Sequence, residues 1–172
     1  PPGLLEGGEF VFADDQTVLI GYGTRSNEAG VLQCARTILK EKIVKTVVMV
    51  PLPSWRVHLD GGLMFIDKDL VLYHPASVTT YPARIIKQNN ENEFLYVTLD
   101  EFIKETFDAE MIPVSDNELY LFGVNTVCIN RRKCIIYEWN ERIINELTER
   151  SCEVFPIRGS ELARGGGGPH CM

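Results

Sequence analysis

The sequence predicts an α/β fold made of a repeated strand–strand–helix–strand unit. Two observations support this prediction. Short apolar runs of strand length alternate with segments in which apolar residues recur every three to four positions, as in an amphipathic helix. The same order of elements returns about every 55 to 60 residues, a repeat length typical of solenoids and propellers.

The first unit covers residues 9–52. Residues 10–12 and 17–20 are apolar and flank a polar turn, which is the pattern of a hairpin. Ser26 is expected to cap a helix, whose apolar positions are Val31, Ala35, Ile38 and Leu39. Residues 46–50 form a continuous apolar run, so they are expected to be a buried strand.

The second unit covers residues 57–115. Thr98 and Glu101 match a capping box in front of a helix over residues 99–107. The polar insert at residues 79–92 is expected to be a surface loop. The strands of this unit are expected at residues 63–66, 70–73 and 110–114.

The third unit covers residues 119–158 and is followed by a glycine-rich loop at residues 159–172. Its strands and helix are expected at residues 126–129, 134–137, 140–150 and 153–157. Each unit presents an apolar sheet face that only a neighbouring unit can cover, so the units are expected to pack around an axis. Three copies would form an open arc, which further units of a longer protein or another component would have to close.

Composition and charge argue against a nucleic-acid or membrane protein. The chain has 172 residues and a net charge of −7, and its Lys and Arg residues are scattered. The short basic run at residues 131–133 is interpreted as a hairpin turn. No apolar run approaches the roughly 18 residues of a membrane helix, and no basic-then-apolar leader opens the chain.

The cysteines indicate a reducing compartment, so a cytoplasmic protein is expected. Their number, five, is odd and their spacing is not that of a disulfide scaffold. Four of them lie in apolar periodic segments and are interpreted as core residues: Cys34, Cys128, Cys134 and Cys152. Cys128 and Cys134 flank one turn, but no second Cys or His pair stands at ligand spacing, so no metal centre is expected.

Three segments with reactive side chains occupy equivalent places in the repeat. Glu6 precedes the first hairpin, His58 and Asp60 precede the second, and Cys171 ends a loop that contains four consecutive glycines. Equivalent positions in a ring of modules converge on its axis. A thiol, an imidazole and a carboxylate brought together there would form a set for covalent catalysis. Asp60, two residues after His58 in a segment expected to be extended, would point to the same side as the imidazole.

Each of these assignments has an alternative. The glycine-rich segment could be a flexible tail. His170 is adjacent to Cys171, but neighbouring residues rarely face each other, so His58 is preferred as the acid/base. Glu9 could be a solvated carboxylate at a strand edge, and His74, which precedes a proline, is interpreted as structural.

The same segments resemble motifs of the guanidino-group modifying enzymes, which include arginine deiminases, agmatine deiminases, dimethylarginine dimethylaminohydrolases and amidinotransferases. Leu5-Glu6-Gly7-Gly8-Glu9 resembles L-E-G-G-D, and His58-Leu59-Asp60 resembles H-x-D. Residues 164–172 resemble R-G-G-G-G-P-R-C-M, and residues 23–27 resemble G-x-R-T-N, with serine in place of threonine. The matches span nearly the whole chain in the same order as in the family, and residues 164–172 are closest to arginine deiminases.

The resemblance implies the five-bladed α/β propeller of the pentein type, with about three of its five modules in this chain. It implies Cys171 as the nucleophile, His58 as general acid/base and Glu6 as the residue that orients His58. Asp60 would bind the substrate guanidinium, and the remaining expected substrate-binding residues are Arg25, Arg164 and Glu9. The reaction implied needs no cofactor and no metal.

The resemblance also has departures. Glu9 stands where the family has aspartate, and His170 stands where arginine deiminases commonly have arginine and agmatine deiminases have histidine. The second guanidinium-binding carboxylate of the family lies upstream of the Glu6 motif, so the chain is expected to be a C-terminal portion that lacks two modules. The chain also stops one residue after the expected nucleophile, where the family continues.

The leading hypothesis is a cysteine-dependent hydrolase that converts arginine to citrulline and ammonia through an S-alkylthiouronium intermediate. Arg25 favours a substrate that bears a carboxylate. An amidinotransferase and a propeller that only binds ligands are the alternatives. A small guanidino compound is the expected partner, with no nucleic acid and no membrane, and the sequence leaves a homodimer open.

Overall fold

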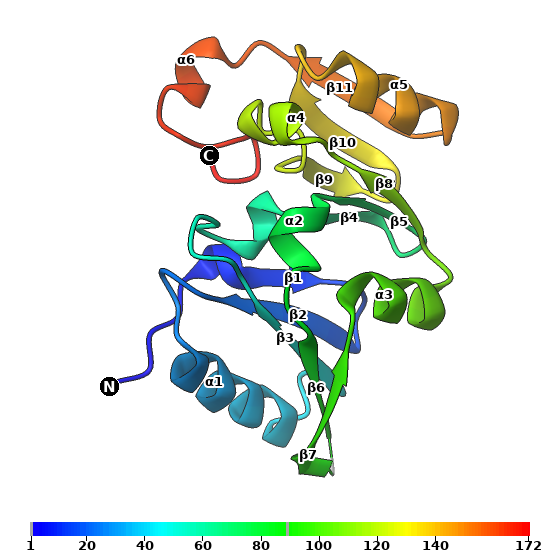
Figure 1. The fold of residues 1–172 in the computed structure, drawn as a ribbon. Helices are drawn as coiled ribbons and strands as arrows, with labels where there is room; N and C mark the ends of the chain where they lie inside the picture. Colours follow the sequence, from blue (N-terminus) through cyan, green and yellow to red (C-terminus); the bar gives the residue numbers. More distant parts are fainter. Residues whose placement is uncertain (1, 89) are drawn as a thin grey trace.

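The computed structural model describes residues 2–88 and 90–172 as a mixed α/β fold with three β-sheets (Figure 1). The first sheet has the order β1-β2-β3-β6-β7, and the other two are β4-β5-β8 and β11-β10-β9. The strands are β1 (Phe10–Phe12), β2 (Thr17–Tyr22), β3 (Thr46–Pro51), β4 (Leu63–Asp67), β5 (Leu70–Tyr73), β6 (Ala83–Lys87), β7 (Asn90–Val97), β8 (Glu110–Pro113), β9 (Val127–Asn130), β10 (Lys133–Tyr137) and β11 (Glu153–Ile157). The helices are α1 (Glu28–Lys40), α2 (Pro75–Val78), α3 (Leu99–Phe107), α4 (Asp116–Tyr120), α5 (Glu141–Glu149) and α6 (Ser160–Ala163), with 3-10 turns η1 (Gly7–Glu9) and η2 (Leu59–Gly61).

Each sheet contains the same arrangement of three strands. A hairpin of two antiparallel strands is followed by a helix and a third strand, which lies parallel to the second hairpin strand. The strand–strand–helix–strand order predicted from periodicity is therefore present in each sheet, with α2, β6 and β7 inserted between β5 and α3 in the second. The residues at 131 and 132 form the turn between β9 and β10, as expected. Within the described residues, none of the three sheets closes on itself.

The insert at residues 79–92 differs from its prediction. It was expected to be a surface loop, but it contains β6 and the start of β7, which extend the first sheet, and β6 pairs antiparallel with β3. Ala83, Ile85 and Ile86 of β6 are buried, so a strand there removes apolar side chains from water. Asn89 lies outside the described residues.

Two helix starts also differ from their predictions. Asn27, and not Ser26, caps α1, because its side chain accepts the Gly30 N–H at 2.8 Å. The buried Ser26 hydroxyl instead accepts the Glu6 N–H at 3.0 Å. Thr98 makes no capping bond to the backbone of α3. A complete capping box is present at α4, between Ser115 and Glu118.

The sheets cover one another's apolar faces. Along β4, Leu63 and Phe65 belong to the cluster shared with the first sheet and α3, whereas Met64 and Ile66 belong to the cluster shared with the third sheet and α5. This alternation follows from the two-residue period of a strand. The middle sheet is therefore apolar on both faces, as expected for a unit that is covered on each side by another. A third cluster packs α1 against the first sheet.

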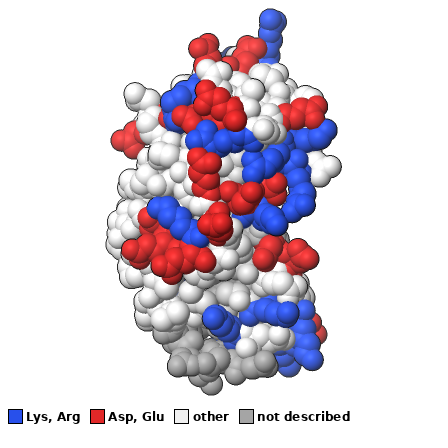
Figure 2. Space-filling model, turned by 90° about the vertical axis from the view of Figure 1, so that its right-hand side faces the viewer, with Lys and Arg blue, Asp and Glu red and all other residues white. Residues whose placement is uncertain are grey.

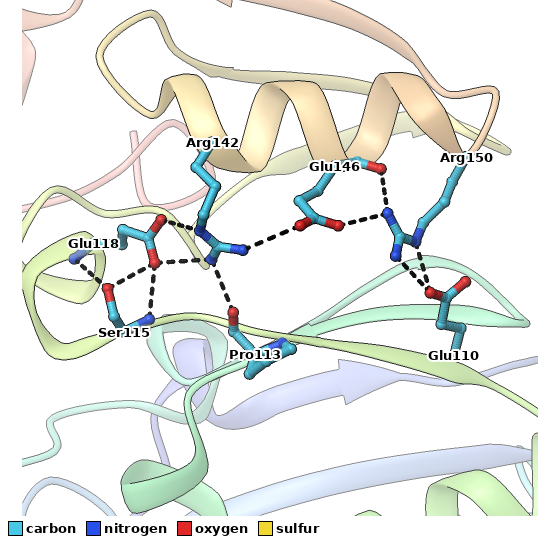
Figure 3. A network of polar contacts seen from close by, with 7 residues as sticks. All are labelled: Glu110, Pro113, Ser115, Glu118, Arg142, Glu146 and Arg150. Carbon is cyan, nitrogen blue, oxygen red and sulfur yellow. Dashed lines mark hydrogen bonds and ion pairs between the residues drawn. The ribbon is translucent and has the colours of Figure 1, made fainter.

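Charged side chains join α5 to α4 and β8. Arg142 and Arg150, both on or directly after α5, bind Glu118 and Glu110, as the close-up in Figure 3 shows. On the face drawn in Figure 2, acidic and basic side chains lie next to each other. Among the helices that the structure describes, none combines the length and apolar character required to cross a bilayer.

Candidate active site

The four residues with the most reactive side chains lie in short irregular segments between sheets. Glu6 directly precedes η1, and His58 directly precedes η2. Asp60 lies within η2, and Cys171 lies in the loop that follows α6. The turns η1 and η2 are in contact with each other, which brings the first two segments together.

Glu6 and His58 form a hydrogen-bonded pair. Glu6 Oε2 and His58 Nε2 are 2.7 Å apart. The other Glu6 oxygen, Oε1, accepts from Arg25 Nε at 3.1 Å and lies 3.0 Å from Arg25 Nη2. The hydrogen bonds from His58 and Arg25 lower the pKa of Glu6. Because Ser26 also holds the Glu6 backbone, the carboxylate has a fixed position from which to orient the imidazole.

Asp60 and Cys171 form a second pair. Cys171 Sγ is 3.6 Å from Asp60 Oδ2, and the same oxygen is 3.1 Å from His170 Nδ1. The Asp60 side chain is buried. The segment that carries it was expected to be extended, but residues 59–61 form the 3-10 turn η2. His170 and the expected nucleophile Cys171 are neighbours in the sequence, and the side chains of both contact the same Asp60 oxygen.

Cys171 is exposed at the surface of the pocket, and its environment favours the protonated thiol. Burial raises the pKa of Cys171, and the nearby Asp60 carboxylate raises it further, because both disfavour a thiolate. Hydrogen bonds from Asn125 and from the Gly168 segment act in the opposite direction. A cation bound between Sγ and Asp60 would offset the repulsion between the two anions.

A pocket of about 150 Å³ is lined by residues from both pairs. His58, Asp60 and Cys171 all contribute to its wall. The remaining lining residues are Arg56, Val57, Gly61, Leu119, Phe122, Asn125, Gly166 and Gly167. The structure therefore places the predicted thiol, imidazole and guanidinium-binding carboxylate at one cavity. The segment with Cys171 packs against the protein and is not an extended tail, since Gly167 and Gly168 are buried.

Glu9 is buried, whereas the alternative from the sequence was a solvent-exposed carboxylate at a strand edge. Its side chain is fully buried, so the alternative of a solvated edge carboxylate is wrong. Oε2 accepts the Leu59 N–H at 3.1 Å, whereas Oε1 has no hydrogen-bond partner among the described residues. Burial raises the pKa of Glu9. Glu9 is not among the residues that line the pocket. Its side chain instead binds the backbone of η2 at Leu59.

The two arginines expected to bind substrate lie outside the lining of this pocket. Arg25 is held on Glu6, and Arg164 is exposed and 3.1 Å from Glu161. The cation that does line the pocket is Arg56, whose Nη1 donates to the Gly61 carbonyl at 3.1 Å. Burial lowers the pKa of Arg56, whereas the charge of Asp60, and that of Cys171 when it is ionised, raise it.

Sequence reasoning missed Arg56 and Asn125. Asn125 precedes the hairpin of the third sheet, as the segments with Glu6 and His58 precede the first and second hairpins. The equivalence of position was the signal that could have identified Asn125. Asn125 was not identified because its amide side chain is uncharged and has no acid–base chemistry.

The other cysteines belong to the interior or to half-buried positions. Burial raises the pKa of Cys128 and of Cys134 to about 12. His74 is buried and is hydrogen-bonded to Ser77 and Asp116, which agrees with a structural role. In the part of the chain that the structure describes, no group of three or more His, Cys, Asp or Glu side chains is arranged to hold a metal ion.

Comparison with known proteins places this arrangement in a family. The family described as "Arginine deiminase" matches residues 1–172. The chain is 29% identical to the arginine deiminase of Mycolicibacterium gilvum and 30% identical to that of Mycobacterium avium, with 98% of the chain covered in each case. The chain spans 45% of the length of each of these two relatives.

Solved structures share the fold at low sequence identity. The N-terminal domain of ArgZ, an arginine dihydrolase from the ornithine–ammonia cycle in cyanobacteria bound to product, has a TM-score of 0.71 and 20% identity over 95% of this chain and 53% of that one. DDAH from Pseudomonas aeruginosa, in complex with citrulline, has a TM-score of 0.69 and 18% identity over 97% of this chain and 54% of that one. The mixed α/β fold is therefore that of the pentein structures. Because the family match extends over every residue, the chain belongs to the arginine deiminase family.

Proposed function

We propose that this chain carries the cysteine centre of a guanidino-group hydrolase that converts arginine to citrulline and ammonia. The observation that carries the proposal is the 3.6 Å distance between Cys171 Sγ and Asp60 Oδ2 in a pocket that His58 also lines. A carboxylate at that distance from a thiol is suited to a substrate whose cationic group is also the electrophile. Membership of the arginine deiminase family and the names of its relatives support arginine as that substrate.

The proposed first step forms a covalent bond to Cys171. Asp60 binds the substrate guanidinium, whose positive charge lowers the pKa of the neighbouring thiol. The thiol loses its proton to solvent, and the thiolate attacks the guanidinium carbon, so that an S–C bond forms as the C–N double bond becomes single. His58, oriented by Glu6, donates a proton to the departing nitrogen, so that ammonia leaves and an S-alkylthiouronium intermediate remains.

The proposed second step consumes water. His58, which has given up its proton, removes one from a water molecule that adds to the same carbon. The S–C bond then breaks, citrulline leaves and the thiol is restored. Neither step needs a cofactor. An amine in place of the water would give amidino transfer, so the identity of the second nucleophile separates a hydrolase from a transferase.

The proposal includes parts of the site and of the fold that lie outside this chain. We infer that the three sheets are three modules of a five-module propeller and that further modules supply a second guanidinium-binding carboxylate. Arg25 is proposed to bind the substrate carboxylate after exchange from Glu6, with Arg164 assisting. Glu9 also stays a predicted substrate-binding residue, although its observed contact is with Leu59. A cytoplasmic location and a homodimer likewise remain predictions.

Product analysis of the full-length protein tests the function. Arginine is supplied with and without glycine or ornithine, and the products of wild-type and Cys171→Ala protein are compared. Citrulline and ammonia in equal amounts, absent with Cys171→Ala, are expected. A new guanidino compound that needs the added amine would replace hydrolysis by transfer. No turnover, together with a Cys171 that does not react with a guanidine-like alkylating agent, would leave a propeller that only binds ligands.

A further inference from the structure

We propose that Asn125 is a positioning residue that holds the thiol of Cys171 and the carboxylate of Asp60 in register. This inference rests on the proposed function, because it concerns the geometry of the same pocket. Asn125 lies two residues before β9 and is buried, with 3% of its surface exposed. The two residues that it contacts, Asp60 and Cys171, are 111 positions apart in the sequence.

The side-chain amide of Asn125 uses both of its ends. Oδ1 accepts the backbone N–H of Cys171 at 3.1 Å, and Nδ2 donates to the backbone carbonyl of Asp60 at 3.3 Å. The backbone carbonyl of Asn125 accepts the N–H of His170 at 3.4 Å. One residue therefore binds the main chain on both sides of the 3.6 Å gap between Sγ and the carboxylate.

The glycine-rich loop is shaped to fit this side chain. A Cβ on Gly168 would lie 2.6 Å from both Cβ and Oδ1 of Asn125, closer than such atoms approach in real structures. The loop can therefore pack on Asn125 only because residue 168 has no side chain. On the other side of the loop, the buried Tyr137 hydroxyl donates to the Gly167 carbonyl at 3.1 Å. The loop that carries Cys171 is thus bound by Asn125 on one side and by Tyr137 on the other.

Asn125 also acts on the charge of the nucleophile. The polar side-chain amide of Asn125 lowers the pKa of Cys171, whereas burial and Asp60 raise it. The groups near Cys171 that carry charge or can titrate are Asp60, His170, Arg56, Tyr137 and His58. Among the lining residues, Asn125 is the uncharged side chain that contacts both the Asp60 and the Cys171 segments. Its removal should therefore change both the position and the acidity of the thiol.

The first test compares Asn125→Ala with wild type in the full-length protein. The rate of Cys171 alkylation by iodoacetamide is followed from pH 6 to 11 by peptide mass spectrometry. We expect the midpoint to rise, because the Asn125 side-chain amide, which lowers the pKa of Cys171, is lost. With arginine, kcat is expected to fall about 100-fold, since small displacements of reacting groups have effects of this size.

Two further variants separate positioning from general damage. Asn140→Ala removes another buried asparagine, whose amide binds Leu121 and Tyr137, and should leave the Cys171 midpoint unchanged. Asn125→Asp keeps the size of the side chain and an acceptor for the Cys171 N–H but replaces the donor with an anion. Asn125→Asp should raise the midpoint of Cys171 alkylation further and also lower kcat. If Asn125→Ala folds poorly, the alkylation midpoint and kcat of Asn125→Asp test the inference in its place.

The outcome is decisive in either direction. A wild-type midpoint and a kcat within about twofold of wild type in both Asn125 variants would overturn the positioning role. Alkylation does not require turnover, so it also separates this inference from the proposed function. If wild-type protein leaves arginine intact, the proposed function fails, and a midpoint that still rises in Asn125→Ala supports the contact between Asn125 and the nucleophile.

Discussion

Two clusters of charged groups at the junctions between sheets are built in opposite ways. In the cluster of Figure 3, each carboxylate meets a guanidinium: Arg142 Nε lies 2.6 Å from Glu118 Oε1, and Arg150 Nη2 lies 2.6 Å from Glu110 Oε1. The hydrogen bonds from Arg142 lower the pKa of Glu118 to about 2. In the pocket, by contrast, Asp60 faces a thiol whose pKa is raised.

The difference shows where the protein satisfies its charges internally and where it leaves them for a ligand. The Glu118 cluster is complete without any added molecule, so its energy contributes to the folded state. The pocket keeps an acidic group beside a potential anion, and Arg56 Nε on its wall has no hydrogen-bond partner among the described residues. A bound guanidinium would add a positive charge beside Asp60 and Cys171, where the protein itself provides Arg56 and His170. Substitutions in the two clusters should therefore affect different measurements.

His58→Ala is expected to have the largest effect on the pocket. Loss of a general acid/base typically lowers a rate by 10² to 10⁴, about 3 to 5 kcal/mol in activation free energy. We expect kcat for arginine to fall by that range, while the melting temperature stays close to wild type because His58 is half-buried. Glu6→Gln should show a smaller loss in the same assay. A His58→Ala enzyme with unchanged kcat would remove this residue from the mechanism.

Gly168→Ala should come next. Its Cβ would overlap with Asn125 at 2.6 Å, so the loop must move away and carry Cys171 with it. A displacement of this kind is expected to lower kcat/KM about 100-fold. Steady-state kinetics with arginine measures the effect, and denaturant unfolding shows how much of it comes from lost stability. Activity equal to wild type would mean that the contact between Gly168 and Asn125 does not position the thiol.

Glu118→Gln tests the other cluster and should affect stability. The depressed pKa of Glu118 means that its charged form stabilises the folded state at neutral pH, by a contribution on the order of 2 kcal/mol. That contribution is present above about pH 4.5 and is lost as the pH falls towards 2. We therefore expect Glu118→Gln to lower the free energy of unfolding at pH 7, with a smaller difference from wild type at pH 3, as measured by urea titration.

The exposed pair of Lys133 and Glu153 provides the matched control for Glu118. About half of each of these side chains is accessible to solvent, with values of 47% and 53%. Surface pairs of this kind contribute about 0 to 1 kcal/mol. Glu153→Gln should therefore leave the urea midpoint nearly unchanged. Equal destabilisation by the two substitutions would contradict the distinction between the multiply hydrogen-bonded Glu118 network and an isolated surface pair.

Tyr137→Phe should have a smaller effect than Glu118→Gln, and it is expected to change both stability and activity. The change leaves the Gly167 carbonyl without its donor, which costs about 1 kcal/mol for a buried hydrogen bond. The free energy of unfolding should fall by that amount, and kcat should fall a few-fold as the glycine loop loosens. Hydrogen exchange of the amides at residues 165–171 provides a direct readout, and unchanged protection there would show that the hydroxyl does not restrain the loop.

Much of the fold was predictable because its elements are defined by local patterns. The hairpins at β1–β2, β4–β5 and β9–β10 consist of apolar runs around polar turns, and those patterns identified them. β6 was missed because its pairing with β3 is not local, and its short apolar stretch is surrounded by polar residues. The start of α1 was placed one residue early, because Ser26 and Asn27 are both good capping residues and only the structure shows which one faces the helix.

The site was predictable where a side chain has distinctive chemistry. Cys171, His58 and Asp60 were placed together from their motifs and equivalent positions, and all three line the pocket. Glu9 was expected to bind substrate or to be a solvated edge carboxylate, because a carboxylate at the start of a strand gives no sign that it is buried. Asn125 acts through hydrogen bonds to the backbone of distant residues, and such contacts leave no pattern in the local sequence.

The pairing of β6 with β3 has a consequence for the order of folding. β3 ends at Pro51, but its free edge is covered only by residues 83–87, which follow the β4–β5 hairpin in the chain. A ribosome would therefore have to synthesise most of the second strand–strand–helix–strand segment before the first sheet could be completed. The first two sheets are expected to fold and unfold as one cooperative unit, in contrast to the independent modules that the repeat suggests.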